Sequence, residues 1–208
     1  MNAPQPSRLY LTTPPRFDPE GLSGTLRKIL AKVEIACVRI DLGPAPEDDW
    51  TQAVNHLIPP CHEADVALVV TDHYRLVEPL GLDGVHLAAA RTPLRDVRKA
   101  LGPDRIVGAF AGASRHQGMV LGEAGADYVS FGPVGETGTL GDDTRAEIEI
   151  FQWWAEMIET PCVAEGGVTL ADAERLAEHA DFIVPDMRIW DAPDQMPDIL
   201  ADYAAVLV

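Results

Sequence analysis

Short apolar runs alternate with segments of helical periodicity along the whole chain. Several runs are continuously apolar, as is typical of parallel strands that are covered on both faces. Helix starts are indicated by Asp18-Pro19-Glu20, by Thr92-Pro93 and by the capping pattern that begins at Thr169. Apolar residues at helical spacing predict a further helix over Ile148–Ile158. The predicted strands are Leu9–Thr12, Ile35–Leu42, Val66–Thr71, Gly84–Leu87, Arg105–Phe110, Tyr128–Gly132, Cys162–Glu165 and Phe182–Val184.

This alternation gives about eight β–α units, and no linker rich in proline, glycine or serine separates them. Eight such units in 208 residues predict one α/β domain over residues 1–208, folded as a single closed (β/α)8 TIM barrel. An open, doubly wound sheet is the alternative, and it usually carries a glycine fingerprint after its first strand. Thr13-Pro14-Pro15 stands there instead, which favours the barrel. Functional residues are then expected on the loops that follow the strands.

Composition narrows the class of partner. Acidic residues outnumber basic ones by 33 to 16, and the formal net charge is -17. Such a surface repels nucleic acid and anionic lipid, so neither is expected as a partner, and an anionic substrate needs a local exception to the overall field. The N-terminal residues lack an apolar signal core, and no run approaches the roughly 18 residues of a membrane span. We therefore expect a cytoplasmic protein.

The three cysteines, Cys37, Cys61 and Cys162, lack metal-type spacing. An odd number at wide separation is typical of a reduced chain. Cys37 and Cys162 lie within apolar runs and are predicted to fill the core.

The segment from Ala164 to Thr169 is the strongest local signal for ligand binding. Gly166 and Gly167 let a phosphate approach the backbone, and the helix that follows offers free N–H groups. Phosphate sites in barrels recur after strands seven and eight. A tight turn between strand and helix also favours glycine, so both interpretations stay open.

Two further segments carry polar groups at strand ends. The loop after the sixth strand places hydroxyls at Thr137 and Thr139, which suit an anion or a heterocycle, although a surface loop would look the same. Asp72 ends the third strand and is a candidate Mg²⁺ ligand. His86 ends the fourth strand and is either a site residue or a hydrogen-bonded structural histidine.

The order of these motifs resembles the thiamine phosphate synthase and thiazole tautomerase superfamily. The matching segments cover most of the chain and are Arg8–Thr13, Asp83–Leu87, Gly125–Val134, Glu136–Thr139 and Glu165–Val168. The resemblance implies a barrel that joins a hydroxymethylpyrimidine diphosphate to a thiazole phosphate, with Mg²⁺ and often as a homodimer. It places Arg39, Asp72, Thr137 and Thr139 at the diphosphate and the metal, and Gly166 and Gly167 at the thiazole phosphate.

The chain departs from the family pattern where the diphosphate is expected. Asp41 stands where the family has a lysine, Leu140 replaces a second lysine, and Arg91 replaces a metal-binding aspartate. The serine expected after the fifth strand is either replaced by Phe110 or supplied by Ser114. These losses of charge matching predict a weakened diphosphate and Mg²⁺ site.

The phosphate end is also altered. Pro185 removes a backbone donor after the eighth strand, and Asp186 adds a negative charge. Gly166 and Gly167 remain, and Arg188 is the candidate source of positive charge for the phosphate. Three hypotheses remain: a divergent synthase, a tautomerase-like or other phosphorylated-heterocycle enzyme with His86 as its base, and a non-catalytic phosphate-ligand binder. His86 and Arg39, together with Thr137 and Thr139, are the candidate catalytic residues. Gly166, Gly167, Arg91, Ser114 and Arg188 are the candidate substrate-binding residues, and Asp72 is the candidate metal ligand.

Overall fold

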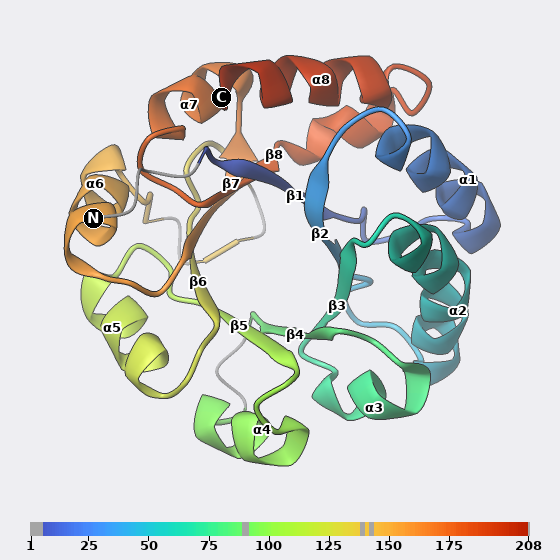
Figure 1. Ribbon diagram of the computed structural model, residues 1–208, viewed down its shortest axis with the longest axis horizontal. Coiled ribbons are helices and arrows are strands. Elements are labelled where there is room, and N and C mark those ends of the chain that lie inside the picture. The colour runs from blue at the N-terminus through green and yellow to red at the C-terminus, as the bar shows by residue number, and fades with distance from the viewer. Residues whose placement is uncertain (1–5, 89–91, 138–139, 142–143, 208) are drawn as a thin grey trace.

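Eight parallel strands close into a barrel in chain order, β1 to β8, with β8 hydrogen-bonded back to β1. The computed structural model describes residues 6–88, 92–137, 140–141 and 144–207. Figure 1 looks along the barrel axis and shows the helices as an outer ring around the strands. The predicted TIM barrel is confirmed. The strands are β1 Arg8–Thr12, β2 Ile35–Ile40, β3 Ala67–Thr71, β4 Gly84–Leu87, β5 Ile106–Phe110, β6 Tyr128–Phe131, β7 Cys162–Val168 and β8 Phe182–Pro185.

Helices follow the strands around the ring. The α-helices are α1 Pro19–Leu30, α2 Glu47–Glu63, α3 Val77–Leu80, α4 Leu94–Leu101, α5 Arg115–Glu123, α6 Ile148–Met157, α7 Leu170–Leu176 and α8 Met196–Val206, with 3₁₀ turns η1 Tyr74–Leu76 and η2 Met187–Asp191. The predicted start of α1 is confirmed, because Asp18 caps it by accepting from the Gly21 amide at 2.7 Å. Among the described residues, no helix has both the length and the apolar character needed to cross a bilayer.

Two hydrophobic cores result from the alternation of side chains along each strand. Outward-facing strand residues such as Leu68 and Val107 are fully buried against the helices. Inward-facing residues form a second, smaller cluster inside the barrel, made of Tyr10, Cys37, Val69, Tyr128, Val163 and Val184. Cys37 and Cys162 are both buried, as predicted.

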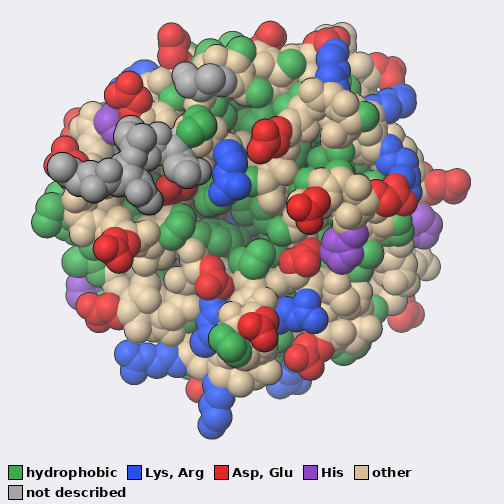
Figure 2. All heavy atoms as spheres, in the orientation of Figure 1, with side chains coloured by type: hydrophobic (Ala, Val, Ile, Leu, Met, Phe, Trp, Pro, Cys, Tyr) green, Lys and Arg blue, Asp and Glu red, His purple; other side chains and the backbone are tan. Residues whose placement is uncertain are grey.

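A glycine in β5 makes room for the largest inward-facing ring. A Cβ atom on Gly108 would lie 2.0 Å from the Tyr128 ring, so no other residue fits there without displacing that ring. In the orientation of Figure 1, acidic and basic side chains are interspersed over the visible face, and hydrophobic side chains gather in the hollow at its centre (Figure 2).

Candidate active site

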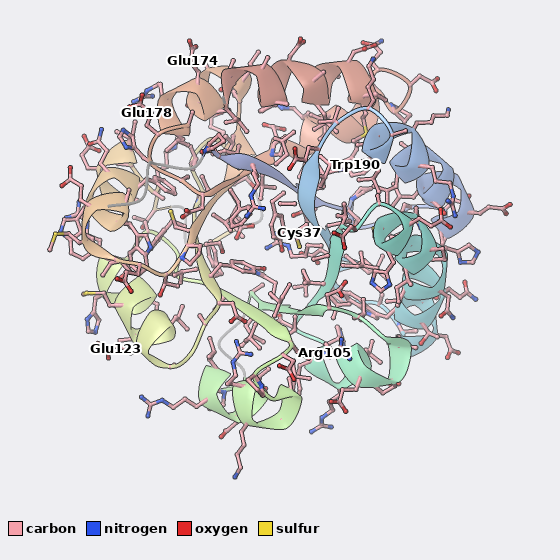
Figure 3. All side chains as sticks on the ribbon, in the orientation of Figure 1. Cys37, Arg105, Glu123, Glu174, Glu178 and Trp190 are labelled. Atoms are coloured by element: carbon pink, nitrogen blue, oxygen red, sulfur yellow. The ribbon has the colours of Figure 1, made fainter. Side chains whose placement is uncertain are left out.

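Polar side chains replace the apolar ones at the carboxyl ends of the strands. Cys37 points into the ring of strands (Figure 3), and Arg39 lies two residues further along β2, so it faces the same side. Strand register pairs Arg39 with Thr12 and His86 with Thr71, which places these four residues on the inner surface. The buried polar residues of this layer are Thr12, Arg39, Thr71, His86, Ser130 and Glu165.

The centre of the layer is an ion pair between opposite sides of the barrel. Arg39 Nη2 on β2 lies 2.5 Å from Glu165 Oε2 on β7, and the two side chains are only 6% and 2% exposed. Burial alone would raise the pKa of Glu165, but the Arg39 guanidinium outweighs it and lowers that pKa to about 2. Burial likewise opposes the charge on Arg39, while the Glu165 carboxylate raises the pKa of that guanidinium. Both groups are therefore charged, and the positive charge of Arg39 is already compensated.

His86 lies beside this pair and is hydrogen-bonded to Tyr128, which in turn contacts Tyr10. Its Nδ1 is 3.0 Å from the Tyr128 hydroxyl, which is 2.9 Å from the Tyr10 hydroxyl. Its Nε2 is 3.7 Å from Glu165 Oε1. Burial, reinforced by the Arg39 charge, lowers the pKa of His86 to about 3. The imidazole is thus neutral near pH 7.

The glycine pair serves close packing between β7 and the loop after β6. Both glycines have positive φ, 84° at Gly166 and 71° at Gly167. A Cβ on Gly167 would lie 2.8 Å from the Glu136 carbonyl oxygen, and one on Gly166 would lie 2.9 Å from Pro133 Cα. Contrary to the predicted boundary at Glu165, β7 continues through both glycines to Val168, which pairs with Pro185. The pair therefore has a packing role that does not depend on a phosphate.

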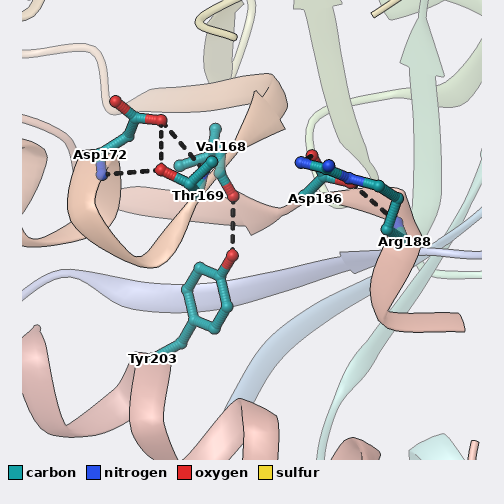
Figure 4. A network of polar contacts seen from close by, with 6 residues as sticks. All are labelled: Val168, Thr169, Asp172, Asp186, Arg188 and Tyr203. Carbon is teal, nitrogen blue, oxygen red and sulfur yellow. Dashed lines mark hydrogen bonds and ion pairs between the residues drawn. The ribbon is translucent and has the colours of Figure 1, made fainter. Parts of the chain in front are cut away.

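The start of α7 is satisfied by its own side chains. Thr169 Oγ1 accepts from the Asp172 amide at 3.2 Å, and Asp172 Oδ2 accepts from the Thr169 amide at 3.1 Å, which completes the predicted capping pattern (Figure 4). Next to it, Tyr203 donates to the Val168 carbonyl oxygen at 2.8 Å. Two of the amides near this helix start thus have partners within the chain.

Arg188 turns back on Asp186 instead of standing alone. Its Nε and Nη2 lie 3.0 and 2.8 Å from the two carboxylate oxygens of Asp186 (Figure 4). Hydrogen bonding from Arg188 lowers the pKa of Asp186, so that carboxylate is ionised. The guanidinium proposed for a substrate phosphate therefore carries a counter-ion already.

The remaining predicted residues occupy separate positions. Asp72 Oδ1 accepts from the Ala88 amide at 2.9 Å. Ser114 is exposed and caps α5 by accepting from the Gln117 amide at 3.2 Å, whereas Phe110 faces inward at the end of β5, in register with Ser130. Thr137 is half-buried in the loop after β6. Arg91 and Thr139 lie outside the described residues.

Glu165 is the central residue that the sequence pattern did not single out for its side chain. The available signal was a charged residue within each of two apolar strands, Arg39 and Glu165, because charges buried in a core need partners of opposite sign. Ser130, Tyr10 and Tyr128 carry no comparable signal, since each reads as an ordinary strand residue.

The comparisons with known proteins agree with the barrel and with its motif order. The family described as thiamine monophosphate synthase matches residues 9–184. A thiamine-phosphate synthase of Rhodospirillum centenum is 42% identical over 201 residues, covering 96% of this chain and 97% of that protein. The chain belongs to the thiamine monophosphate synthase family.

One further relative and one solved structure resemble the chain over most of its length. A thiamine-phosphate synthase of Hyphomonas neptunium is 37% identical over 198 residues, covering 92% of this chain and 90% of that protein. The solved structure of thiamine phosphate pyrophosphorylase from Pyrococcus furiosus superposes with a TM-score of 0.82, covering 96% of this chain and 95% of that one at 22% identity. At that identity the structural match supports the shared fold alone.

Proposed function

We propose that this family member joins a hydroxymethylpyrimidine diphosphate to a thiazole phosphate, and that it holds the diphosphate weakly. In this reaction the bond between the pyrimidine methylene carbon and the diphosphate oxygen breaks, and the thiazole nitrogen bonds to that carbon. Family membership and two relatives of nearly the same length support the reaction class. One observation supports the weakened site: Glu165 already neutralises Arg39.

The charges around Arg39 oppose a diphosphate. Asp41 follows Arg39 at the end of β2, and its position is fixed because its amide donates to Thr13 Oγ1 at 3.0 Å and its Oδ1 accepts from the Gly43 amide at 3.1 Å. Two like charges 4 Å apart repel by about 4 kcal/mol at a surface-like effective dielectric constant. A diphosphate near Arg39 therefore meets a compensated cation and an unfavourable carboxylate.

We assign the candidate residues to the two phosphate-bearing parts of the substrates. Arg39, Thr137 and Thr139 contact the diphosphate, while Gly166 and Gly167 lie at the thiazole phosphate. Ser114 and Arg188 are weaker candidates at the phosphate groups, because Ser114 caps a helix and Arg188 is paired with Asp186. Arg91 stays a candidate there.

The carboxylates of the described residues do not form a Mg²⁺ site by themselves. No group of three or more histidine, cysteine, aspartate or glutamate side chains is arranged for a metal within the described ranges. Asp72 offers one carboxylate, and one of its oxygens accepts from Ala88. Mg²⁺ prefers six oxygen ligands, so most of them would have to come from the diphosphate and from water.

The state of His86 favours the synthase over a tautomerase-like enzyme. General-base catalysis is most effective when the pKa of the base lies near the working pH. A histidine whose pKa is lowered to about 3 is a poor proton acceptor at neutral pH. Formation of the pyrimidine–thiazole bond does not require His86 as a base, because the thiazole nitrogen attacks with its own lone pair and pyrophosphate leaves.

Calorimetric titration of the full chain with each ligand tests this function. Thiazole phosphate, pyrimidine diphosphate with Mg²⁺, and thiamine phosphate are titrated separately, and product formation is followed with both substrates present. We expect synthase turnover with weak diphosphate binding. Binding of thiazole phosphate without turnover would support the non-catalytic binder instead, and binding of none of the three would contradict the proposal.

Two substitutions restore the missing positive charges. Asp41→Lys and Leu140→Lys together are expected to raise diphosphate affinity by tenfold or more, which corresponds to about 1.4 kcal/mol. Leu140 lies against the loop and strand contact, since its Cδ2 would be 2.8 Å from a Cβ on Gly166. Glu178→Lys together with Met157→Lys makes the same change in charge at two exposed positions, the turn after α7 (Figure 3) and the end of α6, and is the matched control. Equal affinities in the double variant and the control would contradict this placement of the diphosphate.

A further inference from the structure

Four buried side chains from four strands form a continuous polar chain across the barrel. It runs from Tyr10 on β1 to Tyr128 on β6, then to His86 on β4 and Glu165 on β7, through contacts of 2.9, 3.0 and 3.7 Å. All four residues are less than a tenth exposed. The His86 and Tyr128 rings are nearly parallel, with an interplanar angle of 16°. The chain therefore has a fixed geometry in a site that excludes water.

The hydrogen bonds along this row of four side chains can run in either of two directions. In one, the hydroxyls donate from Tyr10 to Tyr128 and from Tyr128 to His86 Nδ1, so the imidazole hydrogen sits on Nε2. In the other, Nδ1 carries the hydrogen and donates to Tyr128, so Nε2 presents a lone pair. The two neutral tautomers of histidine differ in this way, and the partner of each nitrogen decides between them.

Glu165 discriminates between the two directions. An ionised carboxylate only accepts hydrogen bonds, and Arg39 Nη2 already occupies its Oε2. Its Oε1 accepts no hydrogen bond of normal geometry from the described residues and faces His86 Nε2. The neutral Ser130 hydroxyl on β6 also lies near this carboxylate and helps to lower its pKa. At 3.7 Å the distance is longer than a hydrogen bond, so electrostatics decides whether the interaction between Nε2 and Oε1 is attractive or repulsive. A hydrogen on Nε2 is attracted to Oε1, whereas a lone pair there is repelled, and the low local dielectric enlarges this difference.

We propose that Glu165 is a positioning residue that fixes His86 as the neutral Nε2–H tautomer, with the hydroxyl hydrogens running from Tyr10 through Tyr128 to Nδ1. His86 Nε2 then directs its hydrogen towards Glu165 Oε1 and presents no lone pair that could act as a base. This inference goes beyond the proposed function, because it concerns the proton position in the protein itself.

The charged and titratable groups that face His86 are consistent with a neutral ring. Arg39 on β2 opposes a second proton on the imidazole, and Glu165 on β7 favours one. Tyr128 on β6 contributes a hydroxyl to Nδ1. From the neighbouring strands, Thr71 on β3 and Gly108 on β5 lie in register with His86 and carry no charge.

Nitrogen-15 NMR of the histidine side chains in the full-length protein measures the tautomer directly. The His86 signals are assigned by their loss in His86→Asn. In the wild type we expect the protonated-nitrogen signal at Nε2, with about tenfold or more excess over the other tautomer. That ratio is what a favourable contact with a buried charge supports.

Glu165→Gln is expected to reverse the direction of the hydrogen bonds that join Tyr10, Tyr128 and His86. The amide oxygen of the introduced glutamine must face the Arg39 donor, so its NH₂ group faces His86 Nε2, which then has to accept. The hydrogen therefore moves to Nδ1, and Nδ1 donates to Tyr128. An unchanged tautomer in a folded Glu165→Gln protein would overturn the proposal, as would a wild-type His86 with the hydrogen on Nδ1 or on both nitrogens.

Two further variants keep the test decisive if Glu165→Gln does not fold. Tyr128→Phe removes the donor to Nδ1 but leaves Glu165, so we expect the hydrogen to stay on Nε2. Its transfer to Nδ1 would mean that Tyr128, and not Glu165, sets the tautomer. Glu178→Gln makes the same change on the outer surface and should leave the His86 signals unmoved. A synthase assay without product would contradict the proposed function while leaving this tautomer result intact.

Discussion

Removing either partner of the Arg39–Glu165 pair should destabilise the barrel far more than removing both. The two side chains are 6% and 2% exposed, so water cannot solvate the charge that remains. Breaking a buried pair costs about 3–5 kcal/mol, whereas replacing both partners with apolar residues of similar volume is often neutral. For a chain of this size each kcal/mol lowers the melting temperature by roughly 2–4 °C. A single substitution should therefore lower it by about 6–20 °C.

The two single substitutions should also differ from each other. Glu165→Leu leaves Arg39, whose guanidinium does not lose its proton in proteins. Arg39→Met leaves Glu165, which can take up a proton and become neutral, so its cost is smaller. We expect the wild type and the double variant Arg39→Met/Glu165→Leu to have similar, high stability. Arg39→Met should be less stable than either, and Glu165→Leu should be the least stable.

Urea denaturation followed by circular dichroism measures these free energies of unfolding, and the four proteins form a double-mutant cycle. A cost below about 1 kcal/mol for Glu165→Leu would refute the reasoning, since an unpaired buried charge cannot be that cheap. Simple addition of the two single effects in the double variant would refute it as well, because the pair would then be uncoupled.

Three further predictions concern single residues. His86 is neutral in the folded state, and its pKa is lowered from 6.5 to about 3; protons therefore bind preferentially to the unfolded chain between these values, and the free energy of unfolding should fall by up to about 1.4 kcal/mol per pH unit below pH 6.5. His86→Gln should remove that part of the slope in urea denaturation at about pH 4.5–7, and an unchanged slope would contradict the lowered pKa. Gly108→Ala should cost about 1–3 kcal/mol, because the added methyl group overlaps the Tyr128 ring; Gly24→Ala, with open space around it in α1, is the control and should not destabilise. Thr169→Ala should cost about 1 kcal/mol through loss of the helix cap, measured by thermal unfolding, and Thr169→Ser should restore most of it.

The alternation of elements could be predicted from the sequence because each strand and helix has its own local signal. Errors arose at strand ends, where the signal depends on turns and neighbours. β2 ends at Ile40 and not at Leu42, because Asp41 accepts from the Gly43 amide and turns the chain. β7 runs beyond Glu165, because Val168 pairs with β8. Neither effect is visible in the hydrophobic pattern of one segment.

The site was predictable in its parts but not in its pairing. His86 was placed at a strand end by the apolar pattern and Arg39 on the second strand by the family resemblance, and the barrel brings both inside. The ion pair of Arg39 with Glu165 joins β2 and β7, which are not neighbours in the sheet, and two residues 126 positions apart in the sequence. The glycine pair matched a phosphate-binding pattern, yet the same two glycines are required by the loop that lies against them.

The contact between β7 and the loop after β6 couples the position of that loop to the position of the strand. Val134 and Gly135 donate to the Gly166 carbonyl oxygen at 3.0 and 2.8 Å, so the loop extends the hydrogen-bonded sheet beyond Phe131. Any outward swing of this loop must break those bonds at the residue that follows Glu165. Motion of the loop that carries Thr137 is therefore mechanically tied to the strand that carries the buried carboxylate. A displacement of this loop is therefore expected to shift Glu165 and its ion pair with Arg39.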